Sequence, residues 1–423
     1  MRASAGVATA DREADARGRV SALGQWDSAV TSYYLLIGAA GLLLTIGLVM
    51  VLSSSSIDAL SASDGRSPYG IFLNQARYAL IALPFAWVAS RLPVAAYRKL
   101  AWPALLAALV LQLLVFVPAL GKSVNGNTNW IVIGGQSIQP SELVKLALAV
   151  WLGAVLARKR ALLDQWSHVI VPGVIVALGA IGLVLLGHDL GTALVMLVMV
   201  TAALFVAGVP GKMFAAAGLL AVPAIVFITQ TSDSRMRRIN AFFSDDCDKL
   251  KECYQTTRGL YALASGGWTG RGLGESREKW SYLPERHNDF IFAILGEELG
   301  LLGTVLVLAL FGVLAVAMTR VIRRHTDPFV QITTAAISAW ILGQALVNIA
   351  VVIGLLPVIG VPLPLVSAGG SALITTMVAL GVVVSFARSE PGAAQALAAR
   401  PGVVRRSLAV VGRATRGARG SRG

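Results

Sequence analysis

Ten stretches of predominantly apolar residues recur along this chain, each long enough to cross a bilayer as a helix of roughly 20 residues. A helix satisfies its backbone hydrogen bonds internally, which is why such segments are stable in lipid. The pattern therefore predicts an all-α polytopic membrane protein with about ten transmembrane helices. The predicted spans cover approximately residues 32–53, 71–90, 100–119, 140–157, 168–187, 190–208, 212–230, 289–319, 328–355 and 369–387.

The composition agrees with a chain that lies mostly in lipid. Charged residues make up 14% of the 423 residues and hydrophobic residues 56%, whereas a soluble domain is about 25% charged. Because apolar spans recur along the chain, we expect one membrane domain over residues 32–388. The first span lacks a small-residue cleavage site, so we expect a retained helix rather than a signal peptide.

The lysines and arginines of the connections set the expected orientation, because cytoplasmic connections are enriched in these residues. They gather in alternate connections, and the opposite short connections hold little beyond Arg66 and Lys122. We therefore expect both termini in the cytoplasm and residues 231–288 outside, as a large extracytoplasmic loop between the seventh and eighth helices. The basic residues of the cytoplasmic connections are Arg91, Arg98, Lys99, Arg158, Lys159, Arg160, Lys212, Arg320, Arg323 and Arg324.

Two arginine-rich tails carry much of the formal net charge of +14. Residues 1–31 form the N-terminal tail and residues 389–423 the C-terminal tail, and both are expected in the cytoplasm. Basic segments beside a membrane usually bind anionic lipid, so we expect lipid rather than nucleic acid as their partner.

The predicted outer loop contains the only two cysteines of the chain, Cys247 and Cys253. In an oxidising exterior their spacing favours a small disulfide loop over two unpaired thiols. The four histidines are scattered without the ligand spacing of a structural zinc site. The glycine-rich run Gly270–Gly274 follows no predicted strand, so the sequence provides no support for a nucleotide site.

Asp289 is the strongest candidate for chemistry, because a charged loop runs through it straight into an apolar span. Charge at the membrane boundary is costly and is usually retained for function. With the expected topology Asp289 faces the exterior, and we interpret it as a catalytic base. Glu297 and Glu298 lie roughly 12 Å deeper along the same helix. We expect them to bond neighbouring helices, with a proton path as the alternative.

Four other ionisable residues lie in or beside the spans. Glu142 and Lys145 are three residues apart, so one helical face carries both, and an ion pair would lessen the cost of burying either. A purely structural pair and a lysine that faces a cavity fit this position about equally. Arg77 can snorkel to the headgroups or meet an anionic ligand. Asp189 precedes the sixth span, where capping the helix is the ordinary role.

Residues 355–371 are too apolar for a solvated loop and too rich in proline for a helix. Irregular backbone is tolerated at membrane depth only where protein or a water-filled cavity satisfies its polar groups. We therefore expect this segment to dip back into the bundle and line a cleft. A set of rigid outer turns would fit the sequence as well.

Four groups of motifs occur in a fixed order along the chain. They are Asn125–Gly126 with Trp130, Ile131 and Gln139–Leu146; Asp189–Thr192; Tyr282–Ala293 with Gly296–Gly300; and Pro362–Pro364 with Ser367–Ser371. Over about residues 30–390 this pattern resembles the SEDS family, the FtsW and RodA glycosyltransferases. Glu278–Trp280, the Ala368–Gly370 form and the long tails are more similar to FtsW of actinobacteria than to RodA. The pattern has four departures: Asn129 stands where an arginine is usual, and Gly187-His188 where an acidic-proline pair is usual. Asn288 stands where threonine is common, and Arg286 where alanine is common in FtsW.

The resemblance implies the SEDS fold and a defined reaction. The family polymerises lipid II, an undecaprenyl-pyrophosphate-linked disaccharide peptide, into glycan strands on the outer face of the cytoplasmic membrane, for FtsW during cell division. Asp289 matches the essential aspartate of the family, which takes the proton of the acceptor hydroxyl. The leaving diphosphate needs cationic stabilisation. Arg77 and Lys145 are our candidates for it, together with a divalent cation, Mg²⁺ or Mn²⁺.

The remaining candidate substrate-binding residues are Glu142, Asp189, Glu285, His287 and Ser367. Glu285 and His287 flank the base, where tuning it, holding an ion and simple solvation are all open. The resemblance also implies a class B penicillin-binding transpeptidase and other divisome proteins as partners, at the division septum. The alternatives are a lipid II flippase, a RodA-like elongation polymerase and a non-catalytic scaffold. Carriers tend to place their coupling charges near the midplane, whereas Asp289 lies at the outer rim, which favours a polymerase.

Overall fold

The computed structural model describes residues 28, 30–62, 65–124, 127–134, 136–230, 233–243, 248, 253–280 and 282–398. The arginines of both predicted tails therefore lie outside the described residues, and so does Cys247. Its predicted partner Cys253 is disulfide-bonded.

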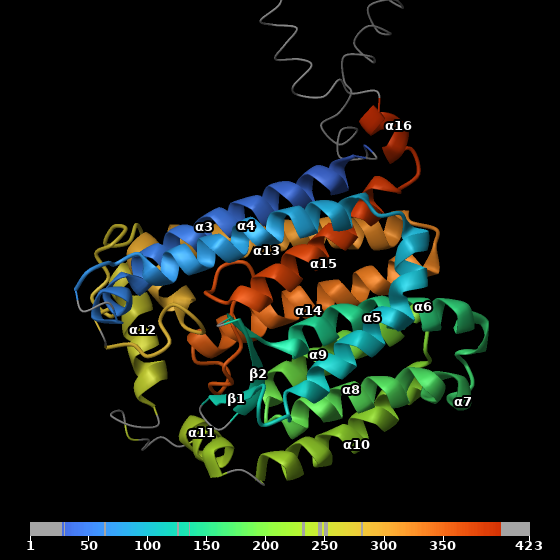
Figure 1. Ribbon diagram of the computed structural model, residues 1–423, viewed down its shortest axis with the longest axis horizontal. Coiled ribbons are helices and arrows are strands. Elements are labelled where there is room, and N and C mark those ends of the chain that lie inside the picture. Colours follow the sequence, from blue (N-terminus) through green and yellow to red (C-terminus); the bar gives the residue numbers. More distant parts are fainter. Residues whose placement is uncertain are drawn as a thin grey trace, which may run out of the picture.

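Long apolar helices make up most of the described chain and run side by side in one bundle (Figure 1). Nine helices among the described residues are long and apolar enough to cross a membrane. The all-α membrane architecture predicted from the sequence is thus confirmed. These helices are α3 (Thr31–Ala62), α4 (Gly70–Arg91), α5 (Val94–Leu114), α6 (Pro140–Lys159), α7 (Trp166–Val169) continued by α8 (Ile175–Leu186), α9 (Leu190–Ala207), α13 (Ile291–Arg324), α14 (Pro328–Val352) and α15 (Gly370–Arg388).

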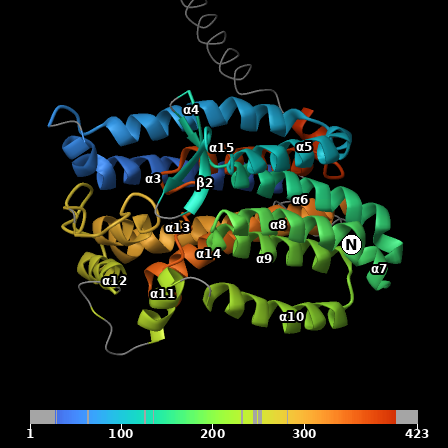
Figure 2. The ribbon, with the colours of Figure 1, turned by 60° about the horizontal axis from the view of Figure 1, so that its bottom comes forward.

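The seventh predicted span, residues 212–230, coincides with α10 (Gly211–Gln230), but this helix differs from the others. Its apolar part, Gly211–Phe227, is shorter than the nine spans. It runs along one edge of the bundle (Figure 2). Where its side chains are described, only Met213 and Thr229 are buried. The count of ten spans therefore stays a prediction.

Two helices are longer than the bilayer requires. α3 has 32 residues and α13 has 34. At 1.5 Å per residue their lengths are roughly 48 and 51 Å, whereas the hydrocarbon core is about 30 Å thick. The second half of α3 lies against the start of α13, where Ser53 donates to Glu298 and Asp58 pairs with Arg286 of the turn that precedes the helix.

The connections contain more regular structure than the sequence indicated. The predicted outer loop holds α11 (Asp233–Phe243) and α12 (Tyr254–Gly266), and α12 lies at the end of the bundle opposite α7 (Figure 1). A three-stranded antiparallel sheet, β1-β2-β3, joins α5 to α6. Its strands are β1 (Gly121–Val124), β2 (Asn127–Ile133) and β3 (Gln136–Ile138). The third span was predicted to reach residue 119, but α5 ends at Leu114.

α6 is the most buried helix of the bundle and organises its core. It packs against α5 on one side and α14 on the other. Gly153 allows the close approach to α14, because a Cβ atom there would lie 1.9 Å from Thr333 Oγ1. Close backbone approach at small residues is a main source of helix association in membranes. The core around α6 therefore has little room for rearrangement.

α13 is broken at Gly300, whose backbone is left-handed (φ 68°, ψ −163°). The amides that the break releases donate to the outer loop, Leu301 N to Gly267 O at 2.9 Å and Leu302 N to Trp268 O at 3.2 Å. In return, two amides of the loop donate to carbonyls of α13 just before the break, at Glu297 and Glu298. The loop thus satisfies a helix end that would otherwise be orphaned inside the protein.

The side chains of Glu297 and Glu298 add to this junction. Glu297 accepts hydrogen bonds from Ser276 Oγ (2.5 Å) and from the amide of Arg277 (2.9 Å), so it binds the outer loop rather than a neighbouring helix. Glu298 accepts from Ser53 Oγ of α3 at 2.6 Å, which confirms the expected bond between helices. Both carboxylates therefore hold the outer loop and α3 against the start of α13.

We predict that Gly300→Ala destabilises the protein. Its Cβ would lie 2.3 Å from Gly270 N, and alanine is strained at this backbone conformation. The expected cost is about 2–4 kcal/mol, measured as a lower melting temperature in detergent. Gly312→Ala on the same helix is the matched control, because nothing lies within 4 Å of its Cβ position. Equal melting temperatures for the two variants would contradict the proposed role of the break.

Candidate active site

Asp289 lies in a tight turn that leads into α13. The turn begins at Glu285, whose backbone is left-handed with a φ of 50°. Its carbonyl accepts from Asn288 N at 3.0 Å and from Phe290 N at 3.2 Å. Its carboxylate accepts from Asn288 Nδ2 at 2.6 Å. Since Ile291 is the first residue of α13, the turn holds the Asp289 carboxylate at a helix N-terminus, where negative charge is favoured.

Three consecutive carbonyls of this turn are bonded to a distant part of the chain. His287 O accepts from Ala368 N at 2.9 Å, and Asn288 O accepts from Ser367 Oγ at 2.7 Å. Asp289 O accepts from Asn348 Nδ2, also at 2.7 Å. The backbone of the turn is therefore fixed on this side, independently of the Asp289 carboxylate.

The partner segment is the proline-rich connection between α14 and α15. Its backbone is irregular, and amide side chains of α14 satisfy its carbonyls. Asn348 Nδ2 also donates to Val361 O at 2.8 Å, and Gln344 Nε2 donates to Pro362 O at 2.9 Å. The expectation that this segment lines a cleft is confirmed, because residues 357–362 form part of the cavity wall described below.

α4 holds the other end of the same segment. Gln75 Nε2 donates to Ser367 O at 3.3 Å, and Gly369 N donates to Gln75 Oε1 at 3.1 Å. Within the segment, Leu363 N donates to Ser367 Oγ at 2.8 Å. The buried Gln75 thus bonds this end of the segment to α4.

An open cavity of about 840 Å³ lies beside the Asp289 turn. Its wall includes parts of α6, α9, α10, α12 and the proline-rich segment. Asp289 Oδ2 would lie 3.5 Å from a Cβ atom at Gly360, so the carboxylate borders the proline-rich wall. The ionisable residues of the cavity lining are Glu142, Asp189, Glu285, Asp289, Lys145 and His188.

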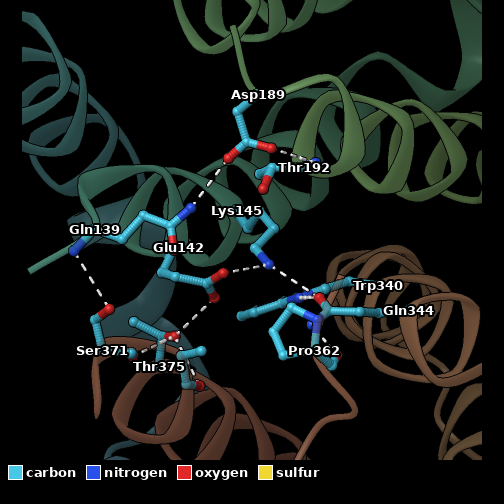
Figure 3. Close-up of polar contacts among 11 residues, drawn as sticks. Gln139, Glu142, Lys145, Asp189, Thr192, Trp340, Gln344, Pro362, Ser371 and Thr375 are labelled. Carbon is cyan, nitrogen blue, oxygen red and sulfur yellow. Dashed lines mark hydrogen bonds and ion pairs between the residues drawn. The ribbon is translucent and has the colours of Figure 1, made fainter. Parts of the chain in front are cut away.

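Glu142 and Lys145 form a buried ion pair in the cavity wall, with 2.8 Å between Lys145 Nζ and Glu142 Oε1 (Figure 3). Lys145 Nζ also donates to Gln344 Oε1 at 3.0 Å and lies 4.8 Å from the centre of the Trp340 ring. Thr375 Oγ1 donates to Glu142 Oε2 at 3.2 Å. The pair therefore joins α6 to α14 and α15, as the interpretation of a structural pair expects. It also lines the cavity, as the interpretation of a cavity-facing lysine expects.

Asp189 caps α9, as the sequence predicted. Its Oδ1 accepts from Thr192 N at 2.9 Å. Its Oδ2 accepts from Gln139 Nε2 at 3.0 Å (Figure 3). Gln139 lies directly before α6, so the cap of α9 also fixes the start of the helix that carries Glu142 and Lys145.

Three sequence-predicted residues lie outside the cavity lining. Arg77 Nη2 donates to Gln136 Oε1 of β3 at 2.9 Å. Ser367 is buried and bonds the Asp289 turn, as described above. His287 faces α3, with its Nδ1 3.3 Å from Asp58 Oδ2. Burial lowers the pKa of His287, although Asp58 opposes the shift, so the neutral imidazole is favoured.

Several residues of the site carried no strong sequence signal. Gln75, Gln344 and Asn348 are uncharged amides in apolar spans. Burying an amide in lipid is costly, and this cost is the one sequence feature that could have pointed to them. His188 lines the cavity with a left-handed backbone (φ 65°). With its side-chain amide turned over, which satisfies its hydrogen bonds, Asn129 donates to Gly187 O at 2.7 Å. Two of the departures from the family pattern therefore meet in space.

Comparison with known proteins agrees with this geometry. The sequence profile of the FtsW, RodA and SpoVE family, described as a cell cycle protein, matches residues 33–391. The chain belongs to this family. Among similar family members is the probable peptidoglycan glycosyltransferase FtsW of Mycobacterium tuberculosis, which is 39% identical over 88% of this chain and 70% of its own length. The FtsW of Geobacter sp. strain M18 is 36% identical over 86% of this chain and 99% of its own length.

Solved structures of the family share the fold. A chain from a study of how a peptidoglycan synthase complex coordinates polymerization and crosslinking superposes with a TM-score of 0.68 and 26% identity, over 84% of this chain and 96% of its own. The rod shape determining protein RodA of Thermus thermophilus superposes with a TM-score of 0.62 and 26% identity, over 84% and 97%. The SEDS fold expected from the sequence is thus confirmed.

We predict that Lys145→Met destabilises the fold by about 3–5 kcal/mol, because Glu142 would remain buried without its cation. The double variant Glu142→Gln/Lys145→Met should recover most of the melting temperature, since it buries no net charge. Lys212→Met, at an exposed position of α10, is the control and should be neutral. A double variant as unstable as the single one would show that the ion pair is not the cause.

Proposed function

We propose that this chain is a peptidoglycan glycosyltransferase that polymerises lipid II into glycan strands on the outer face of the cytoplasmic membrane during cell division. The observation that carries the proposal is the position of Asp289, whose turn is held by its backbone while its side chain lines an open cavity of about 840 Å³. The FtsW relatives, named as probable peptidoglycan glycosyltransferases, support the same reaction.

Asp289 acts as the general base in this reaction. An acceptor sugar hydroxyl transfers its proton to the carboxylate while its oxygen bonds to the anomeric carbon of the donor. The bond between that carbon and the phosphate oxygen breaks, and the lipid diphosphate leaves with the electron pair. One positioned carboxylate suffices, because a diphosphate is a good leaving group and needs no second carboxylic acid.

The leaving diphosphate needs positive charge, and the cavity offers little of it. The ionisable residues of its lining are four carboxylate residues and two basic residues. One of the basic residues, Lys145, is already engaged by Glu142 and Gln344. His188 is the other basic residue of the lining, whereas Arg77 would have to leave Gln136 to contribute.

A divalent cation would supply the positive charge that the cavity lining lacks for the leaving diphosphate. Among the described residues no group of three or more His, Cys, Asp or Glu side chains is arranged to hold a metal ion. The described part of the chain therefore presents no complete metal site of its own. Mg²⁺ is commonly held by one or two carboxylates together with substrate phosphates, so we propose that Mg²⁺ or Mn²⁺ enters with the lipid diphosphate.

The site argues against two of the three alternative roles, and the relatives argue against the third. A lipid II flippase would need coupling charges near the midplane, whereas Asp289 lies beside the outer loop helices. A RodA-like elongation polymerase would share the chemistry, but the FtsW relatives favour division. A non-catalytic scaffold provides no reason for a carboxylate directed into a cavity.

We also propose the partners and the location of the enzyme. A class B penicillin-binding transpeptidase would cross-link the emerging strand, and the solved complex that coordinates polymerization and crosslinking supports such a pairing. Both termini lie in the cytoplasm, and the enzyme acts with other divisome proteins at the septum. Polymerisation assays with and without the cognate transpeptidase would show whether activity depends on this partner.

We predict that Asp289→Asn abolishes glycan synthesis, with a loss of about 10²-fold or more because the base is removed. Purified protein is incubated with lipid II, and the strands are separated on gels. Asp164→Asn changes an exposed carboxylate between α6 and α7 and serves as the control. Strong product from Asp289→Asn would overturn the enzyme assignment. Lipid II transport by wild-type protein without any polymer would favour the flippase.

A further inference from the structure

The Asp289 turn has a second side, which faces α3 rather than the cavity. Arg286 and His287, three and two positions before Asp289, both contact Asp58 near the end of α3. Arg286 Nη2 donates to Asp58 Oδ1, and His287 Nδ1 lies 3.3 Å from Asp58 Oδ2. The Asp58 carboxylate thus pairs with Arg286 and lies beside the imidazole of the next residue of the turn.

Arg286 is poorly placed to choose another partner. The residue is 5% exposed, and its Nη1 also donates to Leu283 O at 3.3 Å. A buried guanidinium without its carboxylate carries a large desolvation penalty. Asp58 is therefore the group that fixes the Arg286 side chain, and through it the backbone of the turn.

The two sides of the turn together form a clamp. On the cavity side, Asn348, Ser367 and Ala368 bind three successive carbonyls. On the other side, Asp58 pairs with Arg286 and lies beside His287. The cavity lining includes none of Asp58, Arg286 and His287. These three residues consequently act on the reaction only through the position of the turn.

We propose that Asp58 is a positioning residue for glycosyl transfer, which sets the place of the Asp289 carboxylate in the cavity through Arg286 and His287. This inference rests on the proposed function. Proton transfer to a general base requires an approach within hydrogen-bonding distance, and a displacement of about 1 Å can cost about 10²-fold in rate. Because Asp58 belongs to α3, the placement of this helix becomes part of the active-site geometry.

The test compares Asp58→Asn, Asp58→Glu and the double variant Asp58→Asn/Arg286→Ala in the purified full-length protein. Lipid II polymerisation provides kcat and KM, and a thermal scan in detergent provides the melting temperature. Asp58→Asn should lower kcat by about 10- to 100-fold and leave KM within about threefold, since the cavity wall is unchanged. Asp58→Glu keeps the charge and should restore part of kcat.

The double variant separates positioning from stability. It removes both charges, so it should regain a melting temperature close to that of the wild type while its kcat stays low. Recovery of kcat together with stability would overturn the proposal, because the pair would then be only structural. The proposal also fails if Asp58→Asn keeps full kcat, or if it changes KM and not kcat. If Asp58→Asn does not fold, the double variant alone decides.

Asp327→Asn is the matched control, because Asp327 also pairs with an arginine, Arg98, at the other end of α14 from Asn348. Asparagine caps a helix as well as aspartate does, so this variant should keep wild-type kcat.

Failure of the proposed function would give a different result from failure of the positioning role. In that case the wild-type protein itself would produce no polymer, whereas failure of the positioning role leaves wild type active and Asp289→Asn inactive.

Discussion

Irregular backbone inside a membrane bundle must have its polar groups bonded to protein, and the active site of this chain depends on how that requirement is met. At Gly300 the outer loop bonds the interrupted turn of α13. At the proline-rich segment, Gln75, Gln344 and Asn348 supply the missing partners. The Asn348 amide nitrogen donates both to this segment and to the carbonyl of Asp289. The side chain that satisfies the irregular backbone therefore also positions the proposed base.

Buried charges obey the same constraint and extend it across the bundle. Glu142 and Lys145 pair within α6 and bond α14 and α15, which closes one wall of the cavity. Arg286 pairs with Asp58, which joins the Asp289 turn to α3. Since an unpaired buried charge is so costly, each pair restricts the helices that carry it to a narrow range of positions. The cavity therefore presents its carboxylates in a defined geometry.

The site was predicted in part because some of its interactions are local. Asp189 caps the helix that begins one residue later, and Glu142 and Lys145 lie three residues apart on one helix, so neighbouring sequence determines both contacts. Arg77 and Ser367 were placed less well, since their partners Gln136 and Asn288 lie 59 and 79 residues away. His188 stood out in the sequence only as a departure from the family pattern and not as a site residue, although its neighbour Gly187 meets Asn129 in the folded chain.

The sequence alone determined the membrane class, nine of the spans, the family and Asp289 as the residue of interest, because long apolar stretches and local motifs are properties of contiguous residues. Tertiary structure decided the small sheet before α6, the cavity, the two-sided hold on the Asp289 turn and the separation of Arg77 and Ser367 from that cavity. These features join residues from helices far apart in the chain. Hydrophobic periodicity records which face of a helix is buried, but not which neighbour buries it.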